Sequence, residues 1–250
     1  MRLPTISGII DRRILTNFRV DPVCMAAALP QPFRPQLFGG YAIGGICLIR
    51  LKQVRPKFFP IRCGIGSENA AHRIAVEWDA DGQTKQGVYI PRRDTNSRLN
   101  TWAGGTVFPG IHHYARFAVT EKNNSYSVTM NSDDGIANVH VSGTVATTLP
   151  KTSIFGSIGE ASNFFEQGAL GYSDTKTNGK YDGLELQCFN WHVESLAIDS
   201  IQSSFFEDTS RFPAGSVEFD CALLMRNIVH EWHGRPDLCC STAVKVDQAD

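Results

Sequence analysis

Apolar and polar residues alternate along most of the chain with a period of two, which is the pattern of strands that bury one face. The alternation predicts strands over residues 41–51, 72–78, 112–121, 184–201 and 216–232. Asp134-Gly135 separates two further alternating stretches, around Val128 and around Val141, and this dipeptide favours a tight hairpin. The polar stretch 172–183 is predicted to be a loop or a long hairpin. The pattern therefore indicates a chain built mainly of β-strands.

Three short helices are predicted between these strands. They cover residues 24–29, about 95–103, and 158–167. Asp21 followed by Pro22 is typical of an N-cap with proline in the first turn. Asp94 or Thr95 is the candidate cap of the second helix, which two glycines end. Ser157, with a glutamate three residues later, matches the capping box of the third.

Composition indicates an ordinary globular protein. The 250 residues carry a formal net charge of −1 and are 42% hydrophobic, which excludes a largely disordered chain and argues against nucleic acid as a partner. No internal repeat or low-complexity linker marks a boundary. We therefore predict one domain over residues 1–250, with an irregular tail from about residue 234. The predicted fold class is mainly β (α+β), a barrel or strongly curved sheet with a few short helices.

The sequence predicts a cytoplasmic protein with no membrane partner. The longest apolar run, residues 38–49, is too short to span a bilayer. Charged residues at positions 11–13 come before an apolar core of signal-peptide length can develop. The seven cysteines are odd in number and several lie in apolar stretches, which favours free thiols over a disulfide framework. Cys239 and Cys240 are the exception, because their irregular surroundings would expose them to oxidation.

Residues 66–73 concentrate several reactive side chains at the start of a predicted strand. Glu68 or His72 is a candidate general acid or base if its side chain points inward. Arg73 is a candidate for holding a carboxylate through two parallel hydrogen bonds. The alternative is a polar strand end with a solvated salt bridge.

A second group of candidates lies near the middle of the chain. Adjacent strand residues face opposite sides, so only one of His112 and His113 can point into a given cavity. His112 shares its face with Tyr114, whereas His113 alternates with apolar residues and is expected to face the core. Arg93 belongs to an arginine pair before a predicted helix and is a candidate for binding an anion. Its alternative role is charge balance with neighbouring carboxylates.

Glu166 follows two phenylalanines on a capped helix and is a candidate for the mouth of a pocket, with Tyr172 just beyond it. His230 and His233 have a spacing that binds metal on a helix, but strand residues three apart face opposite sides. We therefore expect no metal and no cofactor. The sequence contains no serine-hydrolase elbow, no phosphate-binding loop and no Rossmann glycine motif.

Nine short segments have a characteristic order and spacing, namely residues 18–22, 28–30, 40–41, 87–90, 94–99, 108–114, 168–173, 182–184 and 212–216. In these segments the chain resembles the acetoacetate decarboxylase-like superfamily, and more closely its uncharacterised YqjF-like branch. The resemblance spans roughly residues 11–232. It implies a closed, cone-like β-barrel with a central cavity, and it is compatible with a homo-oligomer.

The resemblance does not extend to the amine chemistry of the decarboxylases. These enzymes form a Schiff base with a lysine beside a second lysine, and that pair follows an aromatic-Pro dipeptide. Here Phe108-Pro109 is followed by glycine and isoleucine, and no lysine occurs between positions 85 and 122. The family's arginine before its first motif falls within a residue or two of Arg12 or Arg13. The resemblance therefore implies the cavity without Schiff-base decarboxylation.

The leading hypothesis is an enzyme that binds a small carbonyl or carboxylate compound in the barrel cavity and acts as a lyase or isomerase by acid–base chemistry. The candidate catalytic residues are Glu68, His72 and His112. The candidate substrate-binding residues are Arg13, Arg73, Arg93, Tyr114, Glu166 and Tyr172. One alternative is a non-catalytic small-molecule-binding protein on the same fold. Another is a structural, partner-binding subunit whose cavity is filled by side chains.

Overall fold

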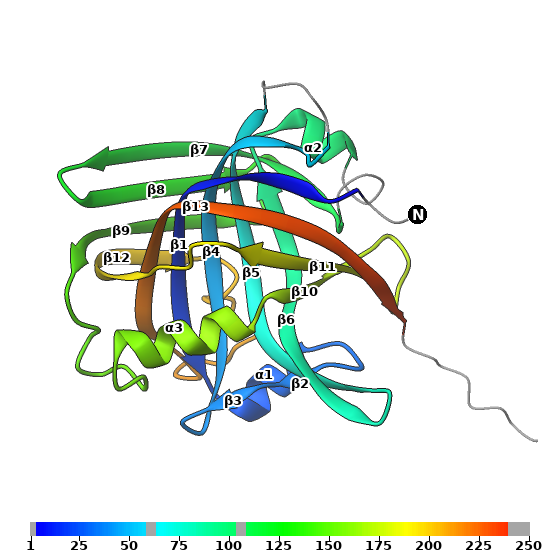
Figure 1. Cartoon of the computed structure of the whole chain (residues 1–250). Coiled ribbons are helices and arrows are strands. Elements are labelled where there is room, and N and C mark those ends of the chain that lie inside the picture. The colour runs from blue at the N-terminus through cyan, green and yellow to red at the C-terminus, as the bar shows by residue number, and fades with distance from the viewer. Residues whose placement is uncertain (1–3, 59–63, 104–108, 240–250) are drawn as a thin grey trace, which may run out of the picture.

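The computed structural model describes residues 4–58, 64–103 and 109–239 (Figure 1). The strands in these ranges are β1 (Ile6–Val20), β2 (Arg34–Pro35), β3 (Leu37–Phe38), β4 (Tyr41–Pro56), β5 (Ile65–Ala80), β6 (Gln83–Thr95), β7 (His112–Lys122), β8 (Ser125–Ser132), β9 (Asn138–Ala146), β10 (Leu170–Asp174), β11 (Lys180–Cys188), β12 (Glu194–Ser203) and β13 (Val217–Cys239). The helices are α1 (Pro22–Ala28), α2 (Arg98–Ala103) and α3 (Ile158–Gln167). The mainly β fold class is confirmed.

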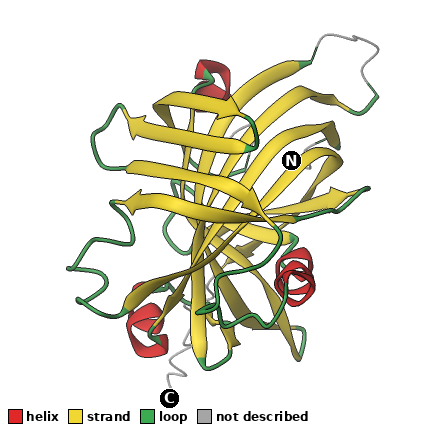
Figure 2. Cartoon of the chain, turned by 90° about the vertical axis from the view of Figure 1, so that its left-hand side faces the viewer, coloured by secondary structure: helices red, strands yellow, loops and turns green. Residues whose placement is uncertain are grey.

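All the described strands belong to one sheet that closes in a ring. Its order is β11-β10-β6-β7-β8-β9-β12-β13-β1-β4-β5-β2, with β3 against β4. Two additional pairings, β5 with β6 and β11 with β13, close the sheet. Figure 2 shows the curved strands crossing the molecule, with the helices at its periphery.

Strands β13, β1, β4, β5 and β6 form a shared wall with a different environment on each face. On one face, residues such as Ile14 and Ile46 pack against buried residues of β8, β9 and β12, such as Val128. On the other face, Leu15 and Cys47 belong to a second apolar cluster that includes residues of α3. Neighbouring residues of a strand point to opposite faces, so one strand supplies both clusters. This second face looks toward β10, β11 and α3, where the candidate site lies.

Most predicted strands are confirmed, with three differences. Residues 184–201 form parts of two strands, because β11 ends at Cys188 and β12 begins at Glu194. The predicted irregular tail from about residue 234 is wrong up to Cys239, because β13 continues through Cys239 and pairs with β11. Strands β1 and β6 were not predicted, although β1 pairs with β4 and β13 along its length and β6 pairs with β5.

The predicted helix caps are confirmed at two of three helices. The Asp21 carboxylate accepts hydrogen bonds from the backbone N–H groups of residues 23 and 24, both at 2.9 Å. Ser157 Oγ accepts the backbone N–H of Glu160 at 3.1 Å. The second prediction is wrong at its start: Asp94 and Thr95 end β6, and α2 begins at Arg98.

No helix within the described ranges is long and apolar enough to cross a membrane. Free thiols are confirmed at Cys24, Cys47, Cys188, Cys221 and Cys239. Cys239 is exposed, and Cys240 lies outside the described residues, as does Phe108. The cytoplasmic location, the single domain and the homo-oligomer stay predictions.

Candidate functional site

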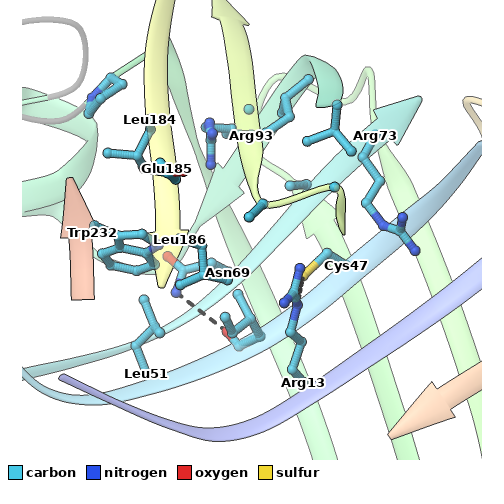
Figure 3. Close-up of a pocket in the computed structure, with 18 of the residues that line it drawn as sticks. Arg13, Cys47, Leu51, Asn69, Arg73, Arg93, Leu184, Glu185, Leu186 and Trp232 are labelled. Carbon is cyan, nitrogen blue, oxygen red and sulfur yellow. Dashed lines mark hydrogen bonds between the residues drawn. The ribbon is translucent and has the colours of Figure 1, made fainter. Parts of the chain in front are cut away.

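A cavity of about 740 Å³ lies between the shared wall and the elements β10, β11 and α3. Most of its lining is apolar, with Leu15, Ile49, Ile90, Leu186 and Trp232 among the contributing side chains. Five arginines also line it, and Arg13 of β1, Arg73 of β5 and Arg93 of β6 are three of them (Figure 3). This combination of apolar walls and a few charged groups is typical of small-molecule sites.

Arg13 of β1 is held by sulfur atoms. Its Nε donates to Cys47 Sγ at 3.2 Å, and its Nη1 lies 3.9 Å from Met225 Sδ. Thiol and thioether sulfurs are weak acceptors, so the remaining N–H groups of this guanidinium are available to a stronger acceptor. No carboxylate of the described residues lies within ion-pair distance of it.

Arg73 of β5 is buried, with 6% of its surface exposed. It donates to Asn17 Oδ1, and its guanidinium carbon lies 4.8 Å from the centre of the Phe165 ring. Its Nε has no partner among the described residues. Burial lowers the pKa of Arg73 to about 10, because the cavity lacks the solvent that stabilises the cation. The side chain is still charged at neutral pH, and its uncompensated charge favours an anion.

Arg93 of β6 lies beside His112 of β7, its parallel pairing partner. Arg93 Nε donates to Ser173 Oγ at 3.0 Å. Burial, together with the positive charge of Arg93, lowers the pKa of His112 to about 3, so the imidazole is neutral at physiological pH. His112 Nδ1 lies 3.2 Å from the carbonyl of Gly110, which can only accept. Nδ1 therefore carries the proton, and Nε2 is left as a proton acceptor.

The strand register explains how distant segments supply this site. Leu15, Cys47, Ala71, Arg93 and His112 are consecutive pairing partners across β1, β4, β5, β6 and β7. Residues in such a row share a face of the sheet, and all five line the cavity. Cys47 was not proposed from the sequence. The signal was present, because Cys47 shares the apolar phase of Ile49 in residues 41–51.

Glu166, at the end of α3, also lines the cavity, and its side chain is exposed. A second carboxylate of the lining, Glu185, pairs with Arg235. A third, Asp94, pairs with Arg92 at 2.8 Å. Glu166 is thus the lining carboxylate that has no ion pair within the described residues. No lysine occurs among the described residues that line the cavity.

Glu68 and His72 lie outside the cavity, on the other face of β5. Glu68 pairs with the buried Arg12 at 2.5 Å, and its pKa is raised because burial outweighs the effect of that cation. His72 is fully buried, with its ring centre 4.9 Å from that of Phe205. The strand alternation that puts Arg73 in the cavity directs both candidates away from it. The structure therefore does not bring them together with Arg73.

Three further candidates also lie apart from the cavity lining. Tyr172 packs in an aromatic cluster, with its ring centre 5.2 Å from that of Trp78. Tyr114 lies under the guanidinium of Arg98 at 5.5 Å. The expectation that His113 faces the core is wrong, because its Nδ1 lies 3.1 Å from the carboxylate of Asp134 and the side chain is partly exposed.

His230 and His233 do not form a metal site with neighbouring residues. Neither ring nitrogen of His230 has a hydrogen-bond partner among the described residues, and its ring packs 4.6 Å from that of Trp232. No group of three or more metal-ligating side chains is present within residues 4–58, 64–103 and 109–239.

The fold and the cavity define a class of proteins with a closed sheet around a small-molecule-sized chamber. The chain belongs to the DUF2071 family, described as an uncharacterized conserved protein, whose profile matches residues 10–216. A search of curated proteins found no match.

Solved structures place the fold with the acetoacetate decarboxylases. Acetoacetate decarboxylase from Legionella pneumophila subsp. pneumophila str. Philadelphia 1 has a TM-score of 0.62 at 10% identity, covering 93% of this chain and 87% of that one. An acetoacetate decarboxylase-like enzyme from Sphingomonas wittichii RW1 has a TM-score of 0.57 at 10% identity, covering 95% and 92%.

The enduracididine biosynthesis enzyme MppR, complexed with pyruvate, has a TM-score of 0.53 at 12% identity, covering 92% of this chain and 88% of its own. The predicted acetoacetate decarboxylase-like fold is thereby confirmed. At these identities the similarity concerns the fold alone, and chemistry must be argued from the residues of the site.

Proposed function

We propose that this protein binds a small carbonyl or carboxylate compound in the cavity. The observation that carries the proposal is the presence of Arg13, Arg73 and Arg93 in one mainly apolar chamber without a carboxylate partner from the described residues. Guanidinium groups bind carboxylates through short, charge-assisted hydrogen bonds. An entering carboxylate would supply the acceptors and the charge that the protein itself does not.

His112 is the group best suited to move a proton in this chamber. It is neutral at physiological pH, it is oriented by the Gly110 carbonyl, and Nε2 is an acceptor. An anionic substrate beside Arg93 would offset that charge and raise the pKa of His112 toward the range of an effective base. Arg93 beside it would stabilise negative charge that develops on a substrate oxygen as the proton leaves. These two residues support a lyase or isomerase that works by acid–base chemistry.

The absence of a lysine from the described lining favours a second candidate function. A non-catalytic binding protein needs the arginines but no amine nucleophile. Both candidates share the binding step, and they differ in whether the bound compound exchanges a proton.

Calorimetric titration with acetate, pyruvate and acetoacetate tests the binding step. We expect at least one to bind, and we expect Arg73→Gln to weaken it about tenfold or more, because one charge-assisted contact is lost. Arg116→Gln is the matched control, since Arg116 is exposed and pairs with Asp133 outside the cavity. Equal affinity in both variants would refute the role of Arg73.

Proton exchange separates the enzyme from the binding protein. In deuterated water, nuclear magnetic resonance of the bound compound would show loss of the proton next to its carbonyl group. We expect His112→Gln to slow that exchange while the affinity stays within a few-fold. Binding without exchange in the wild-type protein would favour the non-catalytic alternative.

A further inference from the structure

Arg13, Arg73 and Arg93 do not aim their guanidinium groups at one point. Arg73, on β5, reaches over β4 to Asn17 of β1. Arg93, on β6, reaches in the opposite direction to Ser173 of β10. In Figure 3 the two side chains accordingly point away from each other.

A glycine on β4 makes the reach of Arg73 possible. A Cβ atom at Gly45 would lie 3.3 Å from Arg73 Nη2 and 2.3 Å from the carbonyl oxygen of Thr16. Any side chain at this position would therefore press on the guanidinium as well as on β1. The Arg73 guanidinium thus lies toward β1, the strand that also carries Arg13.

Arg13, Arg73 and Arg93 therefore form two positive poles in the cavity, apart from Arg235, which pairs with Glu185, and Arg55. The first, which we call the β1 pole, consists of Arg13 and Arg73, and the second, the β10 pole, consists of Arg93 with its neighbour His112. Three to four strand spacings separate the poles in the order β10-β6-β5-β4-β1, because Arg73 reaches β1 whereas Arg13 reaches back to Cys47 of β4. At about 4.8 Å each, these spacings amount to roughly 14–19 Å along the wall, and to less across the cavity because the wall curves.

The wall between the poles is apolar. Ala71 and Cys47 occupy the row of pairing partners that joins Arg93 to β1, and Ile90 lies beside the β10 pole. Two small side chains in this row leave room for the middle of a ligand. Glu166, the lining carboxylate without an ion pair among the described residues, is exposed at the end of α3 and so is not buried with either pole.

We infer that the cavity takes an elongated organic dianion, with one anionic group at the β1 pole, a second at the β10 pole and an apolar chain between them. This inference rests on the proposed function and narrows its ligand class from small carboxylates to those with two separated charges. A ligand with one charge would neutralise one pole and leave the other in apolar surroundings, which is unfavourable.

Titration calorimetry of suberate against octanoate tests the inference, because the two have the same number of carbons and differ in the second carboxylate. We expect suberate to bind the wild-type protein at least tenfold more tightly. The two carboxylates of malonate are too close together to reach both poles. Malonate should therefore exceed acetate in affinity by much less than suberate exceeds octanoate. Arg93→Gln should reduce suberate to the affinity of octanoate, and Arg116→Gln should leave the ratio unchanged.

Equal binding of suberate and octanoate by the wild-type protein would overturn the two-pole inference and leave the proposed function standing. Failure of every carboxylate to bind would overturn both. If malonate exceeds acetate in affinity by as much as suberate exceeds octanoate, the cavity has a single anion site, and the inference is also overturned. If Arg93→Gln does not fold, the comparison of ligands on the wild-type protein decides the question by itself.

Discussion

Replacing His72 with leucine removes a fully buried imidazole whose two ring nitrogens have no hydrogen-bond partner among the described residues. Burial, together with the positive charges of Arg92 and Arg211, lowers the pKa of His72 from 6.5 to about 3. In the unfolded chain this histidine takes up a proton as the pH falls below 6.5, whereas in the folded protein it stays neutral. Acid therefore favours the unfolded state.

The size of the effect follows from proton linkage. Each pH unit between the unfolded and folded pKa values costs about 1.4 kcal/mol of stability, so His72 alone should cost the wild-type protein about 2 kcal/mol between pH 7 and pH 5. His72→Leu removes this dependence. As the pH falls from 7 to 5, the free energy of unfolding of the variant should therefore rise by about 2 kcal/mol relative to that of the wild type.

Urea unfolding followed by tryptophan fluorescence at several pH values measures this difference. His192→Leu is the matched control, because it removes an imidazole that is exposed rather than buried. A difference between His72→Leu and wild type that does not change with pH would refute the conclusion that the His72 imidazole is buried and neutral. Carboxylate affinity should stay at the wild-type level in His72→Leu, since the side chain lies outside the cavity.

Three other outcomes are expected. Glu68→Gln should lower the free energy of unfolding by about 1–3 kcal/mol in urea titrations, because the buried Arg12 loses a charged partner, and should leave carboxylate binding unchanged. Iodoacetamide should label Cys47 more slowly when a carboxylate is bound, as read by mass spectrometry, while the fully buried Cys221 stays unlabelled in the folded protein. Gly45→Ala should lower the melting temperature and weaken carboxylate binding, because the new methyl group meets backbone and Arg73.

Local sequence signals were sufficient for most elements. The period-two alternation identified β4, β5 and β7, and the capping residues Asp21 and Ser157 identified where α1 and α3 begin. These signals work because they depend on neighbours within a few residues. The second helix was placed too early because Asp94 has the chemistry of a cap, but its carboxylate pairs with Arg92 within the strand.

The candidate site could be predicted only in part. Arg13, Arg73, Arg93, His112 and Glu166 were named from the sequence, and the structure places all five at one cavity. Glu68 and His72 were named with them, although strand alternation places both on the face of β5 opposite Arg73. What was missing was the identity of the face that looks into the cavity, because both faces of β5 carry apolar and polar residues.

The sequence by itself determined the β-rich class, the caps of two helices and the absence of a lysine from the position expected in a decarboxylase. It named the arginines as candidates for binding an anion, but not whether they pair with carboxylates. Only the tertiary structure decided which face of the shared wall is hollow and which is packed. The physical reason is that strand register and sheet closure bring together residues from β1, β5 and β6, far apart in the chain. Arg73 and Arg93 extend in opposite directions because their hydrogen-bond partners lie on β1 and β10, on either side of β5 and β6. The two-pole inference therefore also depends on the tertiary structure.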